Sequence, residues 1–242
     1  MSIENLIATS NDSPQDLIAQ SPTERGDMSK QGPLFPVIEH VAIAGHIGVG
    51  KSTLTQLLSE AFDIQAFHEP NLENPFLKRF YSDMSQWAFH SQVFFLVHKF
   101  NAHRAHLDQG EAIIQDRTIY EDAEIFATHL AESGLMSPEE FKTYFDLYNE
   151  FIQLLPPPTL MIYLRASVTT LVDRIEKRGR PEEQQIPRVY LESLHQLYES
   201  WFERYDRSPK LVIEVDHLDY VNNESDRESV IQLIRERLKE LT

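Results

Sequence analysis

The run Gly45-His46-Ile47-Gly48-Val49-Gly50-Lys51-Ser52 matches the pattern G-x-x-x-x-G-K-[ST] and is the strongest chemical signal in the sequence. Three of the chain's 8 glycines fall within its first six positions. Glycines there let successive backbone N–H groups turn inward as a cradle for phosphate oxygens at the start of a helix. The lysine suits the β- and γ-phosphates, and the serine hydroxyl suits Mg²⁺. The residues expected to bind ATP here are Gly45, His46, Ile47, Gly48, Val49, Gly50, Lys51, Ser52 and Thr53.

Two carboxylates follow other apolar runs, where a parallel sheet would bring them close to this loop. Asp116 ends one run, and we expect it to share Mg²⁺ with Ser52. Arg117 comes next, where a guanidinium can stabilise charge on a phosphoryl group in transfer. Glu69 follows another run, at the same sheet edge, and can accept the proton of a substrate hydroxyl. The predicted catalytic residues are Lys51, Glu69 and Arg117.

Basic residues are concentrated in one segment, since six of the 22 Lys and Arg residues lie between positions 165 and 188. Arg174 and Arg178 are four positions apart and share one helix face, and Arg178-Gly179-Arg180 begins a loop. Such a loop can close over a polyphosphate and supply bidentate donors. The alternative is a solvated helix end stabilised by its own dipole. We predict an Arg-rich lid, with Arg174, Arg178 and Arg180 binding ATP.

Short apolar runs that alternate with helical patterns must position these groups. This alternation is typical of βαβ units, so we predict one α/β domain with a parallel sheet of about five strands flanked by helices. The strands are expected at Val41–Ala44, Ile64–His68, Ala112–Asp116, Leu160–Leu164 and Leu211–Val215. The helices are expected at 51–61, 87–109, 119–132, 138–155, 168–177, 188–206 and 225–240.

Composition restricts the classes of partner. The chain has 242 residues and a formal net charge of −16, which argues against binding of DNA or RNA. It has no cysteine, so disulfides and thiolate metal sites are excluded. We see no membrane-spanning run and no secretory or transit signal, so we expect a cytoplasmic protein. Residues 1–36 are polar and predicted to form a disordered acidic tail, and 37–242 are predicted to form the folded domain.

The combined motifs resemble the deoxyribonucleoside kinase family, of the deoxyadenosine, deoxyguanosine and deoxycytidine kinase type. The resemblance runs from about residue 40 to 206 and implies a phosphate-loop kinase fold. It also implies a homodimer formed through a helix bundle, for which the helices at 87–109 and 138–155 are candidates. The implied activity is transfer of a phosphoryl group from Mg-ATP to the 5′-hydroxyl of a deoxyribonucleoside. His46 and Lys99 depart from the residues usual in the family.

The resemblance also assigns the substrate side of the site. Glu69 is implied as the base for the 5′-hydroxyl, Tyr81 and Glu183 as contacts of the sugar 3′-hydroxyl, and Arg174 as a further phosphate contact. Trp87 is implied as a pocket wall and Gln92 as the amide that reads the base. The implied substrate-binding residues are Glu69, Tyr81, Trp87, Gln92, Lys99, Arg117, Asp122 and Glu183.

Base preference follows from donors and acceptors. Gln92 both donates and accepts, whereas an ionised Asp122 only accepts and therefore favours an exocyclic amine. Adenine and cytosine present such an amine, and Lys99 could serve a guanine carbonyl. We expect deoxyadenosine to be preferred, then deoxyguanosine or deoxycytidine. Two alternatives stay open: a nucleoside monophosphate kinase of the thymidylate type, and a non-catalytic nucleotide-binding member.

Overall fold

The computed structural model describes residues 39–68, 74–180, 183 and 186–241. Five parallel strands form one sheet in the order β2-β3-β1-β4-β5. The strands are β1 His40–Gly45, β2 Gln65–Phe67, β3 Ile113–Asp116, β4 Leu160–Arg165 and β5 Lys210–Glu214. The predicted parallel five-stranded sheet is therefore confirmed. The predicted tail 1–36 and the predicted base Glu69 lie outside the described residues.

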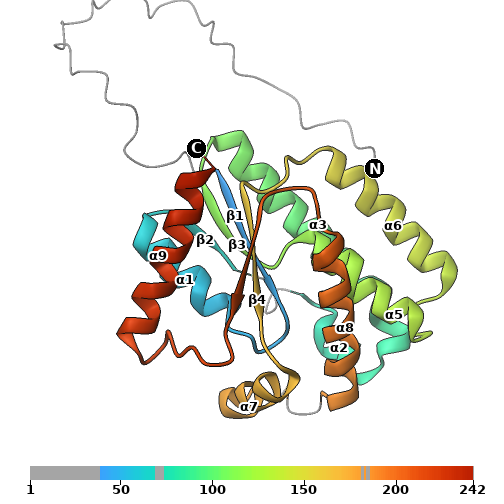
Figure 1. Cartoon of the computed structure of the whole chain (residues 1–242). Coiled ribbons are helices and arrows are strands. Elements are labelled where there is room, and N and C mark those ends of the chain that lie inside the picture. Colours follow the sequence, from blue (N-terminus) through green and yellow to red (C-terminus); the bar gives the residue numbers. More distant parts are fainter. Residues whose placement is uncertain (1–38, 69–73, 181–182, 184–185, 242) are drawn as a thin grey trace, which may run out of the picture. The chain divides into compact units, whose positions relative to one another are not determined.

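Helices cover both faces of the sheet (Figure 1). The helices are α1 Lys51–Phe62, α2 Leu77–Ser82, α3 Met84–Gln109, α4 Ile119–Glu121, η2 Asp122–Ala127, α5 Thr128–Glu132, α6 Pro138–Gln153, α7 Val168–Arg178, α8 Arg188–Arg204 and α9 Glu224–Glu240. In strand β1, Val41 and Ile43 pack in one core cluster with residues of α1 and α9, whereas Ala42 and Ala44 pack in the other with α3, α6 and α8. This alternation is what a strand buried on both faces requires.

Two local features differ from the predicted elements. The short helix α2 was not expected, because its six residues are too few to show a clear period. The stretch predicted as one helix over 119–132 is interrupted by the π-helical segment η2. A π-helical turn inserts an extra residue into the helix and is frequent at functional sites. Within the described residues, no helix is both long and apolar enough to cross a membrane.

Candidate active site

The phosphate loop connects β1 to α1 and depends on glycine for its shape. Gly48 and Gly50 have φ of 83° and 110°, in the region that side chains disfavour. A Cβ at Gly50 would also lie 2.1 Å from the hydroxyl of Tyr220. The Nζ of Lys51 lies inside the loop and donates to the carbonyl of Gly45 at 2.8 Å, and to that of the next residue at 2.9 Å. The lysine is thus buried at the place where the motif predicts phosphate binding.

Two side chains from outside fasten this loop. Arg174 donates to the carbonyl of Val49 at 2.8 Å, and also to those of Val215 at 2.6 Å and Leu218 at 3.2 Å. Tyr220 donates to the carbonyl of the loop residue after Val49, at 3.2 Å. Arg174, which we expected to contact phosphate, therefore ties the loop to the segment after β5 in this structure. Its contact with ATP stays a prediction.

Ser52 and Asp116 meet at the ends of α1 and β3. The hydroxyl of Ser52 donates to Oδ2 of Asp116 at 2.5 Å. Asp116 is 2% exposed, and in the described part of the chain its Oδ1 has no hydrogen-bond partner. A serine hydroxyl beside a buried carboxylate oxygen in need of a partner is a donor set that suits Mg²⁺, which prefers oxygen ligands and keeps several waters. These two residues fit the predicted metal.

Arg117 has a left-handed backbone, with φ of 60°, which is strained for a residue with a side chain. Neighbouring strands hold it there. Its N–H donates to the carbonyl of Ile43 at 3.0 Å, and its carbonyl accepts from the amide of Gln115 at 3.1 Å. Gln115 in turn is 2.8 Å from Nε2 of His40. The guanidinium lies over the ring of Phe126, 4.5 Å from its centre.

The predicted base-reading residues come from α3 and η2. Lys99 and Asp122 form a buried ion pair of 2.7 Å, with side-chain exposures of 0% and 4%. Gln92 lies two turns before Lys99 and is also buried. Among the described residues, the Oε1 of Gln92 has no hydrogen-bond partner, although a buried amide oxygen normally has one. A buried amide and a buried carboxylate with its cation therefore stand on adjacent elements, as a polar base edge requires.

The predicted sugar-side residues lie on α2, on α3 and after α7. Trp87 stacks on Phe76 at 5.9 Å, with Arg79 above its ring at 4.8 Å, whereas Tyr81 is 38% exposed. Burial raises the pKa of Tyr190 on α8, and the positive charge of Arg117 opposes this rise.

Glu183 pairs with both predicted lid arginines. Its Oε2 accepts from Arg178, and its Oε1 lies 3.4 Å from Arg180. The carboxylate is buried, while the side chains of the arginines are 33% and 46% exposed. Glu183, which the resemblance implies as a sugar contact, is therefore paired with Arg178 and Arg180, which we expect to bind phosphate.

Four residues near the site were missed from the sequence: Glu121, Phe126, Tyr190 and Tyr220. Glu121 carried a usable signal, because it is a charged residue inside a mostly apolar stretch, 119–127. The others are aromatic residues, which sequence alone assigns to the core. Helix α3 carries three histidines close in sequence, His98, His103 and His106, but no group of three or more His, Cys, Asp or Glu side chains in the described part of the chain could hold a metal ion.

Fold and site together define a nucleotide-binding phosphotransferase: a parallel sheet, a phosphate loop at its strand ends, and a serine, an acid and an arginine beside it. Comparison with known proteins identifies the family within this class of phosphotransferases. The family model "Deoxynucleoside kinase" matches residues 41–239. The chain belongs to the deoxynucleoside kinase family and is a phosphotransferase.

Individual relatives carry different substrate names. The chain is 36% identical to a deoxyadenosine/deoxycytidine kinase of Bacillus subtilis, with 80% of this chain and 90% of the relative covered. It is 38% identical to a deoxyguanosine kinase of Lactobacillus acidophilus, with coverage of 83% and 91%. The solved deoxyadenosine kinase of M. mycoides with bound dCTP has a TM-score of 0.70 and 31% identity, with coverage of 81% and 98%. This solved structure has the phosphate-loop kinase fold, which the chain shares.

Proposed function

We propose that this enzyme transfers the γ-phosphoryl group of Mg-ATP to the 5′-hydroxyl of a deoxyribonucleoside, with deoxyadenosine preferred over deoxyguanosine and deoxycytidine. The observation that carries the base preference is the buried group on α3 and η2, in which Gln92 lies two turns before Lys99, the partner of Asp122. The family match favours a nucleoside kinase over the thymidylate-type alternative.

The chain's own residues supply each part of the transfer. Ser52 and Asp116 would hold Mg²⁺, which neutralises phosphate charge when it is bound. Lys51 binds the phosphates from inside the loop. Arg117 stabilises the charge that develops on the transferred group, and Glu69 accepts the proton of the 5′-hydroxyl. The lid arginines Arg178 and Arg180 close over the phosphates.

The base preference is supported by hydrogen-bond chemistry. Gln92 can donate to a ring nitrogen and accept from an exocyclic amine, as adenine offers. The Oδ1 of Asp122 accepts from Lys99, so this pair can offer an acceptor or, through the lysine, a donor. The preference for an amine therefore belongs to Asp122, whose ionised carboxylate only accepts, and thymine presents a carbonyl to it instead. Groups left unpaired reduce affinity by about 10- to 100-fold each.

Steady-state kinetics with the four deoxynucleosides and Mg-ATP test the proposal. We expect kcat/KM to be highest for deoxyadenosine and lowest for thymidine. Glu69→Gln should lower kcat by about 10²-fold or more while ATP affinity stays within about threefold. Glu73→Gln, which removes another acid of the same segment, is the matched control and should keep most of the activity. No turnover of any deoxynucleoside would support the non-catalytic alternative, and thymidine as best substrate would refute the role given to Asp122.

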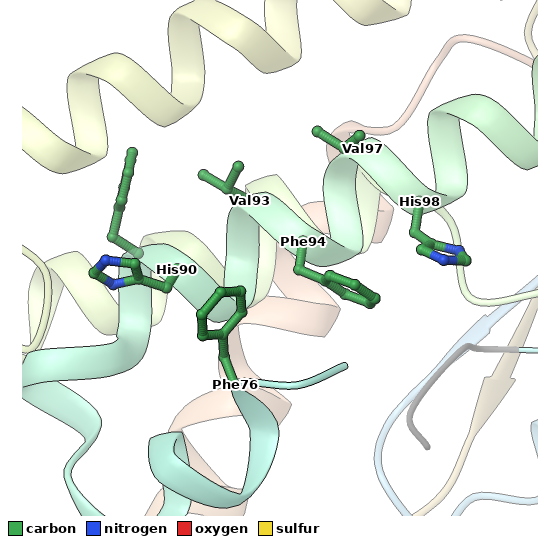
Figure 2. A pocket seen from close by; sticks show the side chains of 7 residues that line it. Phe76, His90, Val93, Phe94, Val97 and His98 are labelled. Atoms are coloured by element: carbon green, nitrogen blue, oxygen red, sulfur yellow. The ribbon is translucent and has the colours of Figure 1, made fainter. Parts of the chain in front are cut away.

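We further propose that the enzyme is a homodimer that pairs through α3. The outward side of α3 carries an apolar groove of about 370 Å³, and Figure 2 shows its lining side chains along this helix with Phe76 beside it. The lining residues are Phe76, Phe89, His90, Val93, Phe94, Val97 and His98. On α6, Leu147 is also 36% exposed. Exposed apolar surface of this kind marks interaction sites, and a second copy is the partner implied by the family resemblance.

Sedimentation velocity tests the dimer. Val97→Glu places a charge in the groove and should convert a dimer into a monomer at micromolar concentration. Leu233→Glu is the matched control, because Leu233 is similarly exposed, at 43% against 38%, but lies on α9. A wild-type chain that sediments as a monomer would refute the proposal, as would equal effects of the two changes.

A further inference from the structure

Glu121 is a buried carboxylate that collects donors from three separate segments. Its Oε1 accepts from the N–H of Gly45 at 3.1 Å and from the hydroxyl of Tyr198 at 3.0 Å. Its Oε2 accepts from the N–H of Thr118 at 2.9 Å and from the hydroxyl of the same residue at 3.3 Å. The side chain is 0% exposed. One carboxylate thus joins the start of the phosphate loop, the segment after β3 and helix α8.

The same carboxylate faces Arg117. The Nε of Arg117 lies 3.9 Å from Oε1 of Glu121. Burial raises the pKa of Glu121, and the charges of Arg117 and Lys51, with the two backbone donors, oppose this rise. Both oxygens of the ionised form accept hydrogen bonds from the backbone and hydroxyl donors, and its charge attracts Arg117, whose Nε is too far from Oε1 for a hydrogen bond between them. A buried charge of this kind is held only when it is paired and hydrogen-bonded.

Arg117 depends on such support more than an ordinary arginine does. Its left-handed backbone, with φ of 60°, fixes the direction in which the side chain leaves the strand end. The ring of Phe126 lies under the guanidinium, 4.5 Å from its carbon, and attracts it as an aromatic face attracts a cation. The carboxylate of Glu121 adds a buried opposite charge 3.9 Å from Nε.

We propose that Glu121 is a positioning residue for phosphoryl transfer, holding the Arg117 guanidinium and the first residue of the phosphate loop in fixed relation to each other. This inference rests on the proposed role of Arg117. Glutamine is not equivalent to glutamate here, because one of its two polar atoms is an NH₂ donor that would face a donor of the protein. A small shift of a catalytic group is enough to slow the reaction, since misplacement by about 1 Å can lower the rate by about 10²-fold.

Glu121→Gln with steady-state kinetics is the first test. We expect kcat to fall by about 10²-fold, with the KM of the nucleoside and of ATP changed less than about threefold. Tyr198→Phe is the matched control, because it removes one donor to the same buried carboxylate and leaves Arg117 untouched. It should keep kcat within about threefold. If Tyr198→Phe lowers kcat as much as Glu121→Gln does, Glu121 acts through general packing and the proposal is wrong.

A double-mutant cycle separates positioning from an independent role. In the Arg117→Ala background, Glu121→Gln should lower kcat by less than about tenfold, because the group it positions is already gone. Losses that multiply to the full product would overturn the proposal. Should Glu121→Gln fail to fold, Glu121→Asp keeps the charge but shortens the side chain, and it carries the same expectations.

Nuclear magnetic resonance gives a readout that does not depend on turnover. We expect a sharp Nε–H signal for Arg117 in the wild-type chain and in Tyr198→Phe, and its broadening or loss in Glu121→Gln. Exchange of the Gly45 or the Thr118 amide with solvent should also become faster by about tenfold or more, because the NH₂ group of glutamine replaces the acceptor of one of these two N–H groups. Unchanged Arg117, Gly45 and Thr118 signals in Glu121→Gln would overturn the proposal. A wild-type chain without kinase activity would instead refute the proposed function, while these signals would still decide whether Glu121 holds Arg117.

Discussion

Acidification below about pH 6.5 is expected to destabilise the fold, because three histidines are buried in neutral form. Burial lowers the pKa of His46 to about 3 and that of His103 to about 4, from an ordinary value of 6.5. Burial also lowers the pKa of His40 well below that value, and the nearby His103 adds to the effect. The rings of His40 and His103 are 4.4 Å apart in an edge-on arrangement. In the described part of the chain, Nε2 of His103 has no hydrogen-bond partner, so a proton there would gain none.

The direction of the effect follows from the lowered pKa values. As the pH falls through 6.5, the unfolded chain binds protons that the folded chain refuses, so stability is lost. The contribution of these neutral histidines to the free energy of unfolding is fully present above pH 6.5. It decreases as the pH falls towards their pKa values in the folded chain, about 4 for His103 and about 3 for His46. At pH 5, His46 and His103 each reduce the free energy of unfolding by about 2 kcal/mol relative to pH 8, and His40 adds to this loss. A typical domain has about 5–15 kcal/mol in total, so the loss is large.

Urea denaturation at pH 8, 6.5 and 5 measures this loss. The free energy of unfolding should fall by about 4 kcal/mol or more between pH 8 and pH 5. His103→Gln should reduce that pH-dependent fall by about 2 kcal/mol, whatever it does to stability at pH 8. His68→Gln, an exposed position directly after β2 and outside the groove on α3, is the control and should leave the fall unchanged. A wild-type stability constant within about 1 kcal/mol over this pH range, or a fall in His103→Gln equal to that of the wild type, would refute the reasoning.

Two further predictions concern ion pairs of the site. Glu183→Gln removes the charged partner of Arg178 and Arg180 and leaves both arginines available for phosphate. In the absence of nucleoside, calorimetry should show that a non-hydrolysable Mg-ATP analogue binds about threefold or more tightly to this variant than to the wild-type chain. An unchanged Kd would contradict this. Lys99→Met leaves Asp122 buried without its cation and should lower the free energy of unfolding by about 3 kcal/mol, most of which Lys99→Met with Asp122→Leu should restore. Urea denaturation measures both variants, and a single-variant loss under about 1 kcal/mol would show that the pair is not needed.

The strands and most helices could be predicted because they rest on local patterns. Strand β4 is a continuous apolar run after three prolines, and α6 begins at Pro138 with Ser137 as its N-cap, residue types that favour a helix start. The π-helical segment η2 could not be predicted, because its residues have ordinary helical propensity and only packing decides the extra residue. Helix α2 is too short for a periodic signal.

The candidate site divides along the same line. The phosphate loop and the Ser52–Asp116 contact follow from a motif and from the rule that parallel strands end at one sheet edge. The three carbonyl contacts of Arg174 do not follow from the sequence, because they join segments 125, 41 and 44 positions apart. Glu183 and its partner Arg178 are only five positions apart. Their pairing was still not expected, because the resemblance assigns each of the two residues to a ligand.

Polar residues inside apolar strands identify how Arg117 is held. His40 is the first residue of β1 and Gln115 lies within β3, two strands in which every residue is buried and apolar side chains are expected. Their side chains form a chain of hydrogen bonds that ends on the carbonyl of Arg117, while Glu121 approaches the guanidinium from the other side. The strained backbone of Arg117 therefore has a buried polar support at each end, and a buried network of this kind persists only when most of its donors and acceptors are satisfied. In this chain, the polar residues His40 and Gln115 in buried strands thus indicate that the neighbouring Arg117 needs a fixed position.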